Sequence, residues 1–97
     1  MMLLTLSSSG ARGAMSEGTC QNVGKLAKIF AQARDNGVSI NDLSLNIEKM
    51  SKTQGSSDFE TMSVKSTAYS IYTDKMSMTP DRVGSYYYTR CLKNSGN

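Results

Sequence analysis

The sequence of 97 residues contains no histidine and no tryptophan, and only one proline and two phenylalanines. Without histidine the chain lacks the commonest general base, the commonest pH switch and the commonest transition-metal ligand, which disfavours hydrolase triads and zinc sites. No carboxylate pair, nucleophile–base pair, Walker loop or GxGxxG motif is present either. We therefore predict a protein that is not an enzyme and that carries no cofactor and no metal.

Cysteine is also scarce, since Cys20 and Cys91 are the only two and stand far apart in the sequence. This spacing excludes a CxxC redox motif and a CxxC zinc motif. Two interpretations remain at this point. The cysteines are either two unrelated buried thiols or the ends of one long-range disulfide.

Long apolar runs are missing, because no stretch approaches the ~20 apolar residues of a membrane-spanning helix. Residues 1–6 are apolar and small Ser, Gly and Ala residues follow them, which resembles the end of a secretory signal. Cleavage is expected after Ala11, with Ala14 as an alternative that Arg12 fits less well. The alternatives are a flexible native tail or residues foreign to the native chain.

We expect residues 1–18 to lie outside the fold, residues 19–93 to form one helical domain, and residues 94–97 to fray.

The remaining sequence carries the spacing and the capping signals of helices. A first helix is predicted over about residues 20–35, with apolar residues at spacings of three and four and an Asn-Gly stop directly after it. Its apolar stripe consists of Val23, Leu26, Ala27, Phe30 and Ala33. A second helix is predicted from an N-cap at Ser39 to about residue 52.

Two further helices are predicted in the second half of the chain. Ser57 and Glu60 form a capping box, and the helix that they start is expected to run to about residue 75. Its apolar positions are spread widely around the helix, which indicates contact with more than one neighbour. A last helix is predicted from the Thr79-Pro80 start signal to residue 92 or 93.

Short loops between these helices favour antiparallel neighbours, so the first helix should start at the end of the bundle where the last one finishes. Cys20 and Cys91 would then meet, and their bond would close a loop of about 72 residues, worth roughly 4 kcal/mol in the chain-entropy model. The predicted fold class is all-α: a compact bundle of about four short helices with a disulfide between the first and the last. Because disulfides persist in oxidising compartments, we expect the protein in the periplasm or outside the cell. On the cell surface it would be accessible to a host.

The chain resembles the small, exported, single-disulfide helical proteins of proteobacteria. The resemblance rests on the early Cys20, on the turn Ala-Arg-Asp-Asn-Gly-Val-Ser at residues 33–39, and on a late Tyr- and Arg-rich helix that ends at Cys91. More distantly, the expected architecture is similar to that of the HdeA acid-stress chaperone. This chain departs from that chaperone in having no histidine and a net charge of +3, and no functional residue is transferred.

Aromatic and sulfur-containing side chains near the end of the chain are the candidate interaction surface. Tyr86, Tyr87 and Tyr88 point about 100° apart on a helix, so Tyr87 should face the core while its two neighbours stay exposed. Together with nearby residues they predict a surface for a protein or peptide partner, as in a chaperone-like module. The candidate residues are Tyr72, Met76, Met78, Tyr86 and Tyr88. The competing interpretation is that the tyrosines shield the edge of the core and that Met50, Met62, Met76 and Met78 fill gaps in it.

The charged residues and the methionines suggest two other functions. With both cysteines reduced in the cytosol, the basic residues would bind nucleic acid, although no recognition motif supports this. Most charges, Arg34 included, lie where the helix dipole favours them, and Lys25, Lys28 and Lys65 form an ordinary solvated face. The pair Met76 and Met78 also permits a weaker hypothesis of Cu(I) binding by thioethers.

Overall fold

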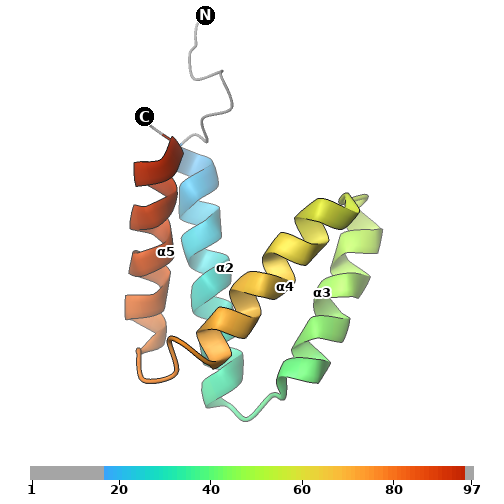
Figure 1. Cartoon of the computed structure of the whole chain (residues 1–97), viewed down its shortest axis with the longest axis horizontal. Helices are drawn as coiled ribbons and strands as arrows, with labels where there is room; N and C mark the ends of the chain where they lie inside the picture. Colours follow the sequence, from blue (N-terminus) through green and yellow to red (C-terminus); the bar gives the residue numbers. More distant parts are fainter. Residues whose placement is uncertain (1–16, 96–97) are drawn as a thin grey trace, which may run out of the picture.

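The computed structural model describes residues 17–95, and these form four α-helices (Figure 1). The helices are α2 (Glu17–Asp35), α3 (Ile40–Gln54), α4 (Asp58–Tyr72) and α5 (Pro80–Ser95), with no strand among the described residues. The all-α prediction is therefore confirmed. The helices reach beyond residues 19–93 at both ends, and the predicted signal segment, residues 1–16, lies outside the described residues.

The predicted capping signals begin and end these helices. Ser39 Oγ accepts a hydrogen bond from Asp42 N at 3.1 Å. In the capping box, Ser57 N donates to Glu60 Oε1 at 2.8 Å while Glu60 N donates to Ser57 Oγ at 3.1 Å. Gly37, two residues after the end of α2, adopts a φ of 89°, a conformation that residues with a side chain rarely adopt. These local signals divide the chain into its four helices.

The helices are arranged as two antiparallel pairs, and this differs in one respect from the prediction. α2 lies alongside α5, and α3 lies alongside α4 (Figure 1). The two pairs meet near the end of α2 that leads into α3 and diverge toward the other end, so α4 leans away from α5 although the two are consecutive. Consecutive helices are therefore not all neighbours, because α5 takes its place against α2.

The core lies where the two pairs meet, and every helix contributes to it. Its buried residues are Ala27, Phe30 and Ala31 of α2, Leu43 and Ile47 of α3, Ala68 and Ile71 of α4, and Val83 of α5. Burial of these side chains is the main favourable term in folding. Because several of them are alanines, the core is thin and its stability depends on further constraints.

The disulfide between Cys20 and Cys91 is one such constraint. It joins the first turns of α2 to the last turns of α5, with a Cα–Cα distance of 5.4 Å and a sequence separation of 71. Cys20 is fully buried. The structure confirms the predicted pairing, and the interpretation as two unrelated thiols is wrong.

Close contact between α2 and α5 is the second constraint. The backbones cross at Gly24 and Gly84, both of which are buried. A Cβ atom on Gly24 would lie 2.9 Å from Gly84 O and 3.0 Å from Tyr88 Cβ. The absence of side chains here allows the two helices to approach and explains why Gly84 stands inside a helix.

Replacing Gly24 with alanine is expected to destabilise the protein by up to about 2 kcal/mol. The new methyl group collides with backbone, and such overpacking costs about 1–3 kcal/mol, which outweighs the gain of up to ~1 kcal/mol in helix propensity. Gly84→Ala is the matched comparison and should cost less, because its Cβ would meet Gly24 O at the longer distance of 3.1 Å. Chemical denaturation measures both variants. A Gly24→Ala protein more stable than wild type would show that the helices do not depend on this approach.

Candidate functional site

The five predicted interaction residues do not form one exposed surface. Tyr72 is half-buried and donates from its hydroxyl to Val38 O at 2.7 Å, and burial raises the pKa of this phenol. Met78 packs against the core. Tyr88 is half-buried beside Gly24, and its hydroxyl donates to Glu17 Oε2 at 3.1 Å, which raises the pKa of Tyr88.

Tyr86 and Met76 are the two predicted residues that are exposed. The Tyr86 ring meets Tyr87 edge to face, with 5.0 Å between centroids, and Lys75 Nζ lies 4.8 Å from its centroid. Tyr87 packs against the core as predicted, and burial raises the pKa of its phenol. Arg90 also donates from a guanidinium nitrogen to the Tyr86 hydroxyl at 3.4 Å, so Tyr86 already has three partners within the protein.

The methionines also differ from the prediction that they fill gaps in the core. Met50, Met62 and Met76 are each more than half exposed, whereas Met78 alone of the four packs against the core. Of the pair considered for Cu(I), Met76 is exposed whereas Met78 packs against the core. No cluster of three or more His, Cys, Asp or Glu side chains suited to a metal occurs within residues 17–95.

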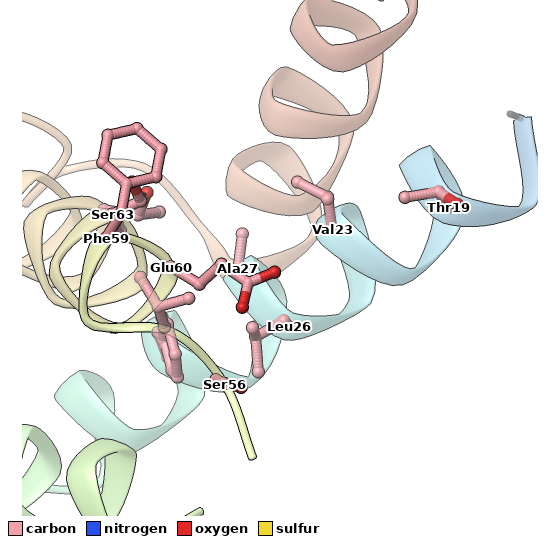
Figure 2. Close-up of a pocket in the computed structure, with 11 residues that line it drawn as sticks. Thr19, Val23, Leu26, Ala27, Ser56, Phe59, Glu60 and Ser63 are labelled. Carbon is pink, nitrogen blue, oxygen red and sulfur yellow. The ribbon is translucent and has the colours of Figure 1, made fainter. Parts of the chain in front are cut away.

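An apolar groove that the sequence did not indicate lies between α2 and α4 (Figure 2). It encloses a volume of about 520 Å³. One wall is α2, with Thr19, Val23, Leu26, Ala27 and Phe30. The other is α4, with Phe59, Glu60, Ser63, Val64 and Thr67, together with Ser56 of the turn before it. Glu60 is the one charged residue among them, and its carboxylate accepts the Ser57 N–H of the capping box.

The groove exists because α2 has apolar residues on two faces. The face with Cys20 and Gly24 meets α5, whereas Val23 and Leu26 line the space toward α4, which leans away from them. Small Ser63 and Thr67 side chains on α4 leave the space between the helices unfilled. Phe59 at the rim is highly exposed. One sequence signal could have indicated the groove. Phe59 is a large apolar residue in the first turn of α4, and it lies outside the buried face of that helix.

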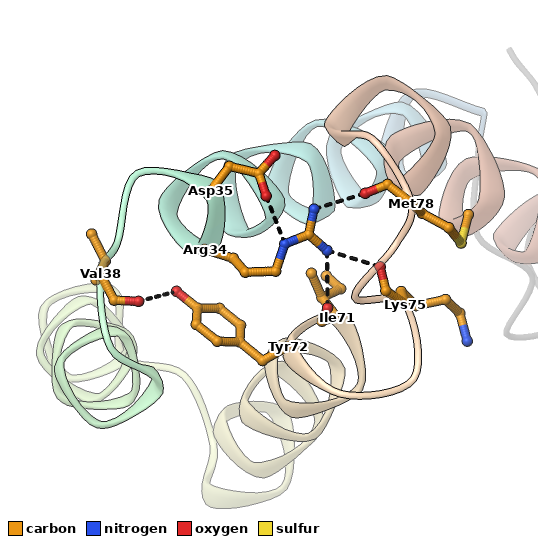
Figure 3. Close-up of polar contacts among 7 residues, drawn as sticks. All are labelled: Arg34, Asp35, Val38, Ile71, Tyr72, Lys75 and Met78. Carbon is orange, nitrogen blue, oxygen red and sulfur yellow. Dashed lines mark hydrogen bonds and ion pairs between the residues drawn. The ribbon is translucent and has the colours of Figure 1, made fainter.

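Arg34 has a role that the sequence does not reveal (Figure 3). Its guanidinium donates to the carbonyl oxygens of Ile71 at 3.1 Å, Lys75 at 2.8 Å and Met78 at 2.7 Å. Its Nε also donates to Asp35 Oδ1 at 2.9 Å, and the side chain is only 9% exposed. The interpretation of Arg34 as a cation placed for the dipole of its own helix is therefore incomplete.

Arg34 instead closes the carboxyl end of a different helix. α4 has no basic residue in its own last turn, and it ends at Tyr72, short of the predicted residue 75. In the turn that follows, the carbonyl groups of Lys75 and Met78 point toward the guanidinium. A guanidinium has several N–H donors in one plane and can therefore bind several acceptors at once. This contact fixes α4 and the 73–78 turn to α2, and so sets the position of the groove's second wall.

Other basic side chains are also paired within the protein. Lys28 Nζ lies 2.8 Å from Asp81 Oδ1, and Lys65 binds Glu48, whose pKa is lowered by the hydrogen bond and charge of Lys65. The predicted solvated face is therefore partly used in links between α2 and α5 and between α3 and α4. These pairs leave less basic surface for a nucleic acid than the sequence indicates.

Within residues 17–95, no helix is both long enough and apolar enough to cross a membrane. Comparison with protein families, with curated proteins and with solved structures gives no match for this chain.

Proposed function

We propose that this protein is a small exported interaction module, without enzymatic activity, that binds an apolar segment of a protein or peptide in the groove between α2 and α4. The observation that carries the proposal is the groove itself: an apolar hollow of about 520 Å³ that the described helices leave open. Binding sites are concave and mostly apolar, with few polar groups. The groove has this character, whereas the predicted tyrosine and methionine residues are largely used inside the fold.

The shape of the groove fits a short segment of a partner. From Thr19 to Phe30 it follows α2 over about 16 Å, which is close to three helical turns. A partner helix of about twelve residues would span it and place apolar side chains at spacings of three and four against Val23 and Leu26. Because the one carboxylate in the lining is engaged by the capping box, selection by charge is weak. We therefore expect recognition of apolar segments in general, as in a chaperone-like module.

Export is supported by two independent features. The Cys20–Cys91 disulfide fits an oxidising compartment, and the apolar run at residues 1–6 resembles a signal sequence. The resemblance to small exported proteins of proteobacteria stays a prediction. Protein recovered from its native cells without reductant should have a shortened N-terminus and the mass deficit of two hydrogens. A full-length chain with both thiols reduced would contradict export.

Substitution of Val23 tests the groove. Val23 lines it and does not belong to the core cluster, so Val23→Asp should place a charge in the groove while leaving the fold intact. The probe is a synthetic, uncharged twelve-residue amphipathic peptide with four leucines, and its serine-substituted form is the blank. We expect Val23→Asp to weaken peptide binding at least tenfold, equivalent to about 1.4 kcal/mol.

Two control variants separate this site from other apolar surfaces. Ile29→Asp removes an exposed apolar residue of the same helix outside the groove lining, and Tyr86→Ser alters the surface predicted from the sequence. Both should bind the peptide within twofold of wild type in a calorimetric titration. Equal losses in Val23→Asp and Ile29→Asp, or a loss confined to Tyr86→Ser, would place binding elsewhere.

A further inference from the structure

The groove between α2 and α4 starts close to the first residue of α2. Thr19, at one end of the groove lining, is two residues from Glu17, where α2 begins. From Thr19 the lining follows α2 through Val23 and Leu26 (Figure 2). The two helix pairs diverge toward this end of α2 (Figure 1). The residues that precede α2 in the sequence therefore join the fold beside one end of the groove.

The segment at residues 1–6 has the chemistry of a ligand for this groove. Its sequence is Met-Met-Leu-Leu-Thr-Leu, with five apolar side chains and no charged one. The groove lining is also mostly apolar, and its one carboxylate, Glu60, accepts a hydrogen bond within the capping box. Methionine side chains adapt to irregular apolar spaces. Contact between the segment and the groove would remove apolar surface of both from water.

The lengths of the segment and of the groove also match. Six residues in an extended conformation span about 20 Å, and the groove follows α2 over about 16 Å from Thr19 to Phe30. Residues 7–16 connect the segment to α2, which is enough chain to turn back at the start of the helix. Gly10 and Gly13 in this connection accept the backbone conformations that a reversal needs. Residues 1–6 can therefore lie along the groove without any change in the four helices.

Attachment to the same chain favours this occupant over a free one. A tether of about ten residues holds a segment at an effective concentration in the millimolar range. With an intrinsic dissociation constant of about 0.1 mM, the segment would fill most grooves and weaken the binding of a free peptide about tenfold. Outside the four helices, the sequence has no other apolar run of comparable length.

We infer that residues 1–6 occupy the groove of their own chain and close it to other apolar segments, an inference that rests on the groove being a binding site. Removal of this segment, as by the predicted cleavage after Ala11, opens the groove. The uncleaved chain is thus protected from binding apolar segments, and binding begins once the segment has been removed.

A single tryptophan tests the contact, because the chain has none of its own. In the oxidised full chain, Leu4→Trp should emit at the shorter wavelengths of a buried indole. Adding Val23→Asp, which puts a charge in the groove, should shift the emission to that of an indole in water. Adding Ile29→Asp, which changes an exposed residue of α2 outside the lining, is the matched control and should leave the emission unchanged. Circular dichroism checks that the variants keep the helical fold.

Peptide binding tests whether the segment competes for the groove. In a calorimetric titration with the four-leucine peptide, the full chain carrying Leu3→Ser, Leu4→Ser and Leu6→Ser should bind about tenfold more tightly than wild type. Leu45→Ser is the control, because it removes an exposed leucine of α3 outside the groove lining and should leave the affinity within twofold.

The two experiments separate failure of this inference from failure of the proposed function. A solvent-exposed indole in Leu4→Trp, or emission that Val23→Asp does not alter, would overturn the inference whatever the peptide does. Emission that changes with protein concentration would assign the contact to a second copy and also overturn it. Equal peptide affinity in wild type and the triple serine variant would overturn the competition but leave the proposed function standing. A buried indole without peptide binding by either protein would support the contact and contradict the proposed function.

Discussion

Replacing Cys20 and Cys91 together with alanine is expected to lower the free energy of unfolding by about 4 kcal/mol. The bond joins residues 71 positions apart, and closing so long a loop removes much of the entropy of the unfolded chain. Domains of this size have only about 5–15 kcal/mol of stability in total. The loss is therefore a large fraction, and the first turns of α2 and last turns of α5 should fray before the rest.

Urea denaturation of the oxidised wild type and of the double variant measures this effect. Each single variant should lose nearly as much as the double variant, because either substitution removes the bond. This non-additivity separates loss of the disulfide from loss of packing at two sites. A double variant within about 1 kcal/mol of wild type would mean that the contact between α2 and α5 holds the ends of the domain without the bond.

Replacing Arg34 with methionine is expected to cost about 3 kcal/mol or more. The substitution keeps much of the aliphatic length but leaves the carbonyls of Ile71, Lys75 and Met78 without their donor. A hydrogen bond to a charged group contributes about 1.5–3 kcal/mol, and a buried acceptor without a partner carries a penalty of its own. Amide hydrogen exchange should increase most in the 73–78 turn and at the carboxyl end of α4.

Arg34→Lys separates the two possible roles of this residue. A lysine keeps the positive charge but is a compact point donor that cannot reach three carbonyls in the geometry of a guanidinium. We expect it to recover less than half of the lost stability. Full recovery by lysine would contradict the account, because it would show that a cation near the helix ends is sufficient, as the sequence alone indicates.

The helices and the disulfide could be predicted because their signals are local or follow from topology. Ser39, Ser57 and Gly37 act on residues within a few positions of themselves. The pairing of Cys20 with Cys91 needed only that the first and last helices be antiparallel, and this holds although α4 and α5 diverge.

The site could not be predicted, because it depends on distances between helices. A helical wheel places Tyr88 beside Tyr87, but only the close approach at Gly24 brings the Tyr88 side chain against α2. The acceptors of Arg34 are backbone carbonyls up to 44 residues away, and carbonyls have no sequence signature. The stripe of Val23 and Leu26 was correctly expected to be apolar. Part of this stripe stays uncovered because the α3–α4 pair leans away from α2. No single residue determines that angle between the helices.

The location of the peptide on the protein is the most direct test of the proposed function. We would follow backbone amide resonances of the oxidised protein by NMR during titration with the leucine peptide. If the peptide binds in the groove, the largest shifts will occur at Val23, Leu26, Ser63 and Thr67, on its two walls. Shifts confined to Met76 and Tyr86, or no shifts at millimolar peptide, would contradict binding in the groove.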